Sequence, residues 1–138
     1  MGRILAIDYG RKRVGIAVTD PLQMVANGLK TVHSKDILTF LQEYCQAETV
    51  EKFIVGKPKQ LNNQDSEAMN YVRPFVEKLQ KQFPDIPVIL IDERFTSSMA
   101  SQTLIQSGVN RKTRQNKQLV DTISATIILE SYLEANKM

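Results

Sequence analysis

Two apolar segments on either side of a short polar turn open the chain. Residues 3 to 9 and 13 to 19 combine apolar and β-branched residues, a pattern that favours β-strands. Gly10, in the turn between them, is the residue best suited to a positive φ angle. The pattern predicts an antiparallel hairpin, followed by a third strand at about residues 26 to 33.

Four later segments are expected to form helices, because they carry apolar residues at helical spacing or begin with polar residues that can cap a helix. Ser34 is the expected N-cap of the first, and Pro74 in the second predicts a kink or a restart of the helix. The third would be capped within residues 96 to 98 and end at Gly108. The expected helices cover residues 35 to 48, 65 to 82, 96 to 108 and 118 to 135.

Two short, strongly apolar segments complete the predicted sheet. KFIVG ends at Gly56, and VILID ends at Asp92. The alternation of these strands with helices predicts an α/β fold with a mixed sheet, antiparallel first and then parallel. Right-handed crossovers would bring the ends of these strands to the same edge as Asp8, at the end of the first strand. Ligand sites in open α/β sheets lie outside that edge.

Three acidic residues belong to this predicted edge. Asp8 ends the first strand, Glu93 follows the last, and Asp121 lies early in the final helix, on the same stripe as Ala125 and Ile128. Carboxylates brought within a few ångströms repel one another unless cations lie between them. Two divalent ions about 3.5 to 4 Å apart are the recurrent solution in phosphodiester hydrolysis. The pattern therefore favours a metal-dependent catalytic site.

Each acid alone also has an ordinary structural explanation. Asp121 could interact with a helix N-terminus, and Asp8 could be a turn acid after a strand. Glu93 could pair with the adjacent Arg94. The catalytic interpretation therefore depends on the three acids acting together.

Composition limits the remaining possibilities. The chain has 138 residues, 42% hydrophobic and 24% charged, which suits one globular domain over residues 1 to 138. Neither a membrane helix nor a signal segment is apparent, so a cytoplasmic protein is expected. One cysteine, Cys45, and one histidine, His33, exclude an internal disulfide and a zinc cluster. Both are expected to be structural, and any metal, Mg²⁺ or Mn²⁺, would be held by oxygen atoms.

The net charge is only +3, but basic residues gather in a few loops near the predicted edge. Solvated loops are the ordinary explanation for any one cluster. Together the clusters favour a polyanionic partner such as a nucleic acid. The candidate nucleic-acid-binding residues are Arg11, Lys12, Arg13, Lys57, Lys59, Arg94, Arg111, Lys112, Arg114 and Lys117.

Four segments in order resemble the YqgF/RuvX family of RNase H-like proteins: AIDYGRKRVGIAVTD, GKPKQLN, IDERFTS and KQLVDTISATIILESYL. The resemblance covers essentially the whole chain. It implies an RNase H-like fold with a five-stranded mixed sheet, and a catalytic, metal-binding site at Asp8, Glu93 and Asp121. Lys117 matches a usually basic family position, whereas Asn63 stands where the family usually has glycine, a departure that Asn tolerates better than most residues.

The family is named both for Holliday junction resolution and for pre-16S rRNA processing. The resemblance implies a metal-dependent nuclease, with two ions of Mg²⁺ or Mn²⁺, that processes the 5′ end of pre-16S rRNA during ribosome biogenesis. Its partners would be pre-rRNA and the pre-ribosome, with the protein a monomer or a weak homodimer. Two alternatives stay open: a resolvase of four-way DNA, which would require a stable dimer, and a noncatalytic nucleic-acid-binding assembly factor.

A more distant alternative starts from DYGRKRVG, which also resembles the phosphate loop of actin-like ATPases. Those proteins bind nucleotide between two lobes, and 138 residues are too few for both. Two aromatic residues, Tyr9 and Phe95, flank the acids and could stack on a base, although core packing is the commoner role of such residues.

Overall fold

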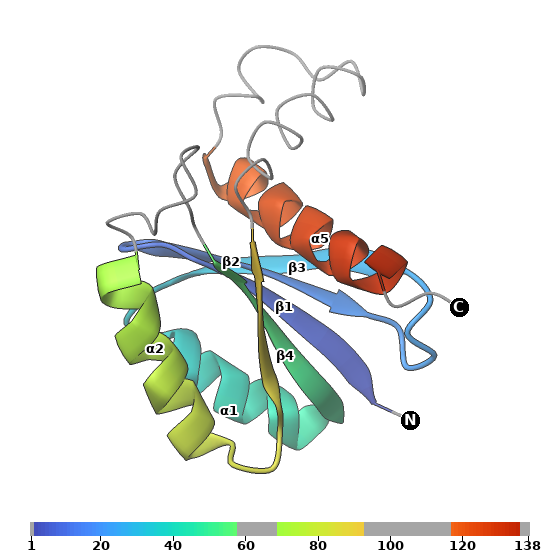
Figure 1. The fold of residues 1–138 in the computed structure, drawn as a ribbon, viewed down its shortest axis with the longest axis horizontal. Helices are drawn as coiled ribbons and strands as arrows, with labels where there is room; N and C mark the ends of the chain where they lie inside the picture. Colours follow the sequence, from blue (N-terminus) through green and yellow to red (C-terminus); the bar gives the residue numbers. More distant parts are fainter. Residues whose placement is uncertain (1, 58–68, 93–116, 136–138) are drawn as a thin grey trace.

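The computed structural model describes residues 2 to 57, 69 to 92 and 117 to 135, in which five strands form one mixed sheet (Figure 1). The strand order is β3-β2-β1-β4-β5; β1–β2 and β2–β3 are antiparallel, and β1–β4 and β4–β5 are parallel. The predicted α/β architecture is therefore confirmed. The strands are β1 Arg3–Tyr9, β2 Arg13–Thr19, β3 Ala26–His33, β4 Val50–Lys57 and β5 Val88–Asp92.

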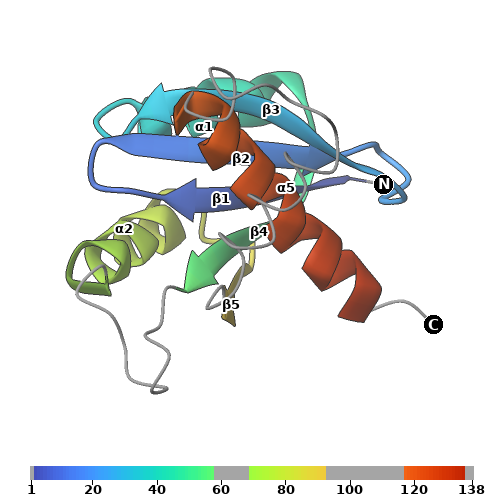
Figure 2. The same ribbon diagram turned by 90° about the horizontal axis from the view of Figure 1, so that it is seen from above.

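Helices cover both faces of the sheet. α1 (Ile37–Ala47) and α2 (Met69–Gln82) pack on one face, and α5 (Lys117–Ala135) packs on the other (Figure 1). Figure 2 shows α5 crossing the strands, and it contacts β1, β2, β3 and β4. α5 therefore joins the hairpin side of the sheet to the parallel side.

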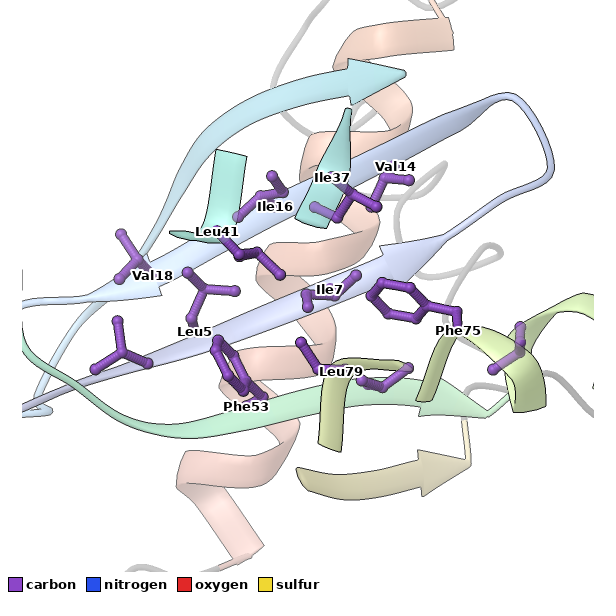
Figure 3. Packing of buried hydrophobic residues seen from close by; sticks show 13 residues of the cluster. Leu5, Ile7, Val14, Ile16, Val18, Ile37, Leu41, Phe53, Phe75 and Leu79 are labelled. Atoms are coloured by element: carbon purple, nitrogen blue, oxygen red, sulfur yellow. The ribbon is translucent and has the colours of Figure 1, made fainter. Parts of the chain in front are cut away.

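The α1–α2 face holds the larger hydrophobic cluster. Alternate residues of β1 and β2, such as Leu5 and Ile7, point toward this face because strand side chains alternate between the two sides. Figure 3 shows them packing against Leu41 of α1 and against Phe75 and Leu79 of α2. All are buried, so the helical stripes predicted for these two helices face the core.

The α5 face combines three buried alanines with larger apolar side chains. Ala6 of β1 and Ala17 of β2 are fully buried beneath Ala125 of α5, within a cluster that includes Ile128 and Leu129. Alanines at these positions let the helix axis come close to the sheet. Asp8 has the same parity in β1 as Ala6, so its side chain belongs to this face.

The turn between β1 and β2 differs from the prediction. The φ angle of Gly10 lies outside the left-handed region that glycine usually supplies. Gly10 is instead constrained by space, because its N–H donates to the Arg13 carbonyl oxygen at 3.0 Å and a Cβ atom would lie 2.6 Å from that oxygen. The predicted positive φ is therefore wrong, although the residue type is still required.

The start of α1 also differs from the prediction. The N-cap is Asp36, which makes no side-chain capping bond, and the helix begins at Ile37. Ser34 is not the cap because its hydroxyl donates to the Arg11 carbonyl oxygen at 2.7 Å. A contact between the hairpin turn and the β3–α1 connection has thus replaced the local capping bond.

The remaining predicted elements agree with the structure to different extents. β4 is longer than the predicted strand, and α2 runs through Pro74 without a break, so the expected restart is wrong. Pro74 has no backbone N–H, so α2 lacks the hydrogen bond from residue 74 to the carbonyl oxygen of Asn70, which lies in the first turn of the helix. The predicted start of this helix at residues 65 to 68 and the predicted helix at residues 96 to 108 lie outside the described residues.

Candidate active site

Asp8 is the one predicted catalytic residue whose side chain the structure describes. It is the next-to-last residue of β1, half-buried, on the face covered by α5. Gly15 of β2 is its direct partner in the antiparallel ladder, so the residue paired with Asp8 has no side chain. The position is therefore partly excluded from water, and its cross-strand partner adds no side-chain bulk.

A row of three residues crosses the sheet at Asp8. Gly15 pairs with Asp8 on one side and with Thr31 of β3 on the other. Adjacent strands are about 4.8 Å apart, so Thr31 lies roughly 10 Å from Asp8 across the sheet. We call Asp8, Gly15 and Thr31 the Asp8 row.

The N-terminal half of α5 is tied to this row. The hydroxyl oxygens of Thr31 and Thr122 lie 2.8 Å apart and share a hydrogen bond. Asp121 directly precedes Thr122 and lies one helical turn before the buried Ala125. The fold therefore brings the backbone of Asp121 to the same end of the same sheet face as Asp8.

A close contact with Gly28 of β3 holds Thr122 as well. A Cβ atom on Gly28 would collide with the Thr122 methyl group. Gly28 and Thr31 are three residues apart and would point to opposite faces of a regular strand. A register shift between Ile16 and Ala17 places Gly28 opposite Ala17 and Thr31 opposite Gly15, so both face α5.

Gly28, Thr31 and Thr122 are positioning residues, since they hold α5 at the sheet. The sequence alone did not predict this role for them. Thr122 stands next to a predicted acid, which was the only available signal. The partners of Thr122 depend on an irregularity of β3 that neither hydropathy nor turn residues reveal.

The parallel strands end at the same edge. Lys57 pairs with Asp92 at the last position of β4 and β5. Glu93 follows Asp92 directly but lies outside the described residues, so its position relative to Asp8 stays a prediction. In the described parts of the chain, no group of three or more His, Cys, Asp and Glu residues could hold a metal ion.

The basic residues of the hairpin turn flank this edge. Arg11 and Lys12 are exposed at its tip, and Arg13 begins β2. The structure describes Lys57 and Lys117 only as backbone positions, at the end of β4 and the start of α5. The other predicted nucleic-acid-binding residues lie outside the described residues: Lys59, Arg94, Arg111, Lys112 and Arg114.

His33 and Cys45 have the structural roles predicted for them. His33 ends β3, where its Nδ1 accepts a hydrogen bond from the Lys35 N–H at 3.0 Å. Cys45 is a partly buried residue packed against the core, and burial raises the pKa of its thiol, which favours the protonated form.

Comparison with known families identifies the lineage. Residues 2 to 135 match the model of a family described as "RuvX: Holliday junction resolvase". This chain belongs to the RuvX family. A relative from Phocaeicola vulgatus is 59% identical over 137 residues and covers 99% of both chains. A relative from Bacteroides fragilis is 55% identical over 138 residues and covers both chains fully. Both are named "Putative pre-16S rRNA nuclease".

Solved structures resemble this RuvX-family chain in fold. A Fowlpox virus resolvase in complex with Holliday junction DNA has a TM-score of 0.63 and 15% identity, with 99% of each chain covered. RuvC from T. thermophilus in complex with a Holliday junction substrate has a TM-score of 0.59 and 14% identity, with 99% of this chain and 97% of RuvC covered. These likenesses confirm the RNase H-like fold.

The family assignment and the names of the relatives confirm the predicted class of enzyme, a nuclease that hydrolyses phosphodiester bonds. Among the described residues, no helix is both long enough and apolar enough to cross a membrane.

Proposed function

We propose that this RuvX-family protein is a divalent-metal-dependent nuclease that processes the 5′ end of pre-16S rRNA, acting in the cytoplasm on the precursor particle. The observation that carries the proposal is the convergence at the Asp8 row. Asp8 and the start of α5 meet on one face of the sheet through the hydrogen bond between Thr31 and Thr122. Close relatives carry the name "Putative pre-16S rRNA nuclease", which favours this RNA as the substrate.

The catalytic roles would fall on Asp8, Glu93 and Asp121. Their carboxylate oxygens are hard ligands that suit Mg²⁺ or Mn²⁺, and Asp8 is half-buried with a glycine as its cross-strand partner. Two such ions, when bound, lower the pKa of a water nucleophile and stabilise the leaving oxygen. The Thr31–Thr122 bond would hold α5, and with it Asp121, at a constant distance from Asp8.

Substrate binding would come from the basic residues around this edge. Arg11 and Lys12 are exposed at the hairpin tip, where their side chains can reach phosphate groups on either side of the sheet. Phosphate contacts position a nucleic acid without reading its sequence. Binding should therefore weaken steeply with added salt.

Four-way DNA is the second candidate substrate. The family is described as a Holliday junction resolvase, and two structural neighbours are bound to such junctions. Cutting a junction symmetrically requires two active sites in one dimer. A dimer in solution would therefore be necessary for this activity.

The deciding experiment compares two labelled substrates, a 5′-extended small-subunit rRNA precursor fragment and a four-way DNA junction. Each is incubated with and without Mg²⁺ or Mn²⁺, and Asp8→Asn serves as the control for contaminating nuclease. We expect metal-dependent cutting of the RNA by the wild type alone. Cutting of the junction alone would replace the proposal with resolvase activity.

A binding assay distinguishes the proposed nuclease from the noncatalytic alternative. Asp121→Asn should abolish cutting while RNA binding falls less than about threefold, because phosphate contacts supply most of the affinity. Cutting at the wild-type rate by Asp121→Asn would refute the assignment of Asp121. RNA binding by the wild type without any cutting would favour an assembly factor.

A further inference from the structure

We propose that a pocket on the α1–α2 face of the sheet binds single-stranded RNA flanking the bond to be cut. This inference rests on the proposed function and adds a second binding site to it. The pocket has a volume of about 370 Å³ and lies between β1, the start of α1 and α2. Its lining includes Tyr9, Lys35, Asn70, Pro74, Phe75 and Lys78.

The pocket is adjacent to the candidate active site through the sheet. Tyr9 follows Asp8 in β1, so the two side chains point to opposite faces of the same strand end. A strand of RNA at Asp8 can therefore reach Tyr9 by passing around the end of β1. No long path over the protein surface separates the two positions.

The hairpin turn forms one rim of this path. Ser34 lines the pocket, and its hydroxyl donates to the Arg11 carbonyl oxygen at 2.7 Å. The Ser34 N–H donates to the Lys12 carbonyl oxygen at 3.0 Å. The backbone of Arg11 and Lys12 thus borders the pocket at Ser34, and their exposed side chains are available to contact the connecting phosphates.

The lining has the chemistry that single-stranded RNA requires. Lys35 and Lys78 are exposed cations on opposite sides of the pocket, one before α1 and one on α2. Asn70 adds an amide that can both donate and accept hydrogen bonds. The neighbouring acids in the sequence, Asp36 and Glu77, do not line the pocket. Among the described residues, the charged side chains of the lining are therefore both lysines.

An aromatic wall completes the pocket. The rings of Tyr9 and Phe75 are stacked with centroids 4.3 Å apart and an interplanar angle of 15°. Phe75 is buried, and its stack orients the half-buried ring of Tyr9, which lines the pocket. A fixed aromatic ring between two lysines suits a base or ribose with its phosphates. An acidic protein segment would use the lysines but not the aromatic wall.

The test measures RNA binding without added metal, so that no cutting occurs. Two RNAs share the cleavage site; one is truncated close to it and the other carries single-stranded extensions on both sides. The double variant Lys35→Ala/Lys78→Ala should bind the extended RNA about tenfold more weakly than the wild type, and the slope of log K against log salt should fall by about two. Binding of the truncated RNA should be equal in both proteins.

Lys81→Ala is the matched control, since Lys81 is exposed on the same helix but does not line the pocket. It should bind both RNAs as the wild type does.

Equal binding of the extended RNA by the wild type and the double variant would refute the site, and so would an equal loss for both RNAs. If polyglutamate displaced the extended RNA more effectively than the single-stranded extension itself did, the pocket would be assigned to an acidic protein. Cutting is measured separately with Mg²⁺, so a protein that binds the extension but never cuts would refute the proposed function and leave the pocket assignment intact.

Discussion

Gly10 is fixed by the space around it. Because the obstructing atom is the backbone oxygen of Arg13, 2.6 Å from an added Cβ, the neighbour cannot move without opening the turn. We expect Gly10→Ala to lower the free energy of unfolding by about 1 to 3 kcal/mol, measured by urea denaturation. Lys12→Ala, at an exposed position in the same turn, should change it by less than about 0.5 kcal/mol. Equal effects of the two variants would contradict this explanation.

Asp20 organises the loop between β2 and β3. Backbone N–H bonds from Val25, Met24 and Leu22 stabilise its carboxylate and lower its pKa below the ordinary value of 3.8. A lowered pKa in the folded state means that the carboxylate stabilises the loop above pH 3.8. This contribution is lost as the pH falls through the folded-state pKa.

The pKa of Asp20 can be measured by carboxyl ¹³C NMR, with amide exchange at Met24 and Val25 as a second readout. We expect the midpoint below 3.8 and a loss of exchange protection, relative to the intrinsic exchange rate at each pH, only below that midpoint. Asp20→Asn should remove the pH dependence of this protection. A midpoint at or above 3.8 would show that the three N–H bonds do not stabilise the charge.

At the scale of elements, the strands and the last helix were predicted well. β1, β2 and β3 have the predicted bounds, and α5 starts one residue earlier than predicted. β1, β2 and α5 carry buried apolar residues that mark them in the sequence, whereas β3 is largely exposed and was placed after the break at Asp20 and Pro21. The start of α1 was wrong because the hydroxyl of Ser34 bonds to a turn that is far away in the sequence. Local capping rules cannot anticipate a partner of this kind.

The candidate site was predicted less completely than the fold. Asp8 could be assigned to the edge of the sheet because its strand was clear, and the structure agrees. The contacts that hold α5 at this edge depend on Gly28, Thr31 and the register shift between them. A shift of register changes which face a side chain occupies, and the sequence carries no local signal for it.

The contact between α5 and β3 can be tested by moving the helix and then restoring it. Gly28→Ala should displace α5, because the new Cβ would collide with the Thr122 methyl group. A displacement of about 1 Å at a catalytic group can lower activity by roughly a hundredfold, so we expect a loss of this size in metal-dependent RNA cutting.

Thr122→Ser supplies the restoring change. Serine keeps the hydroxyl that bonds to Thr31 and lacks the methyl group that would collide. The double variant Gly28→Ala/Thr122→Ser should therefore recover cutting to within about threefold of Thr122→Ser alone. A double variant as inactive as Gly28→Ala would show that the loss has another cause.

At the scale of the whole molecule, the sheet separates two hydrophobic clusters, and we expect one to determine mainly stability and the other mainly the position of α5. The cluster under α1 and α2 contains most of the largest fully buried side chains, among them Phe53 and Leu79. The cluster under α5 is built around Ala6, Ala17 and Ala125, and it sets how closely α5 approaches Asp8. Stability should therefore depend mainly on the first cluster, and activity on the second.

One substitution in each cluster tests this separation. Leu79→Ala leaves a cavity under α2 and should cost about 2 to 5 kcal/mol of unfolding free energy. Ala125→Leu overfills the contact between α5 and the sheet and should cost about 1 to 3 kcal/mol. Both are measured by urea denaturation, and RNA cutting is measured at a temperature where both variants are folded.

We expect the less destabilised variant to be the less active one. Leu79→Ala should cut within about threefold of the wild type, because its cavity lies across the sheet from Asp8. Ala125→Leu should lose at least about tenfold, because it pushes the helix that carries Asp121 away from the face that carries Asp8. If activity instead followed stability across both variants, the small side chains under α5 would be a packing solution with no bearing on the geometry of the site.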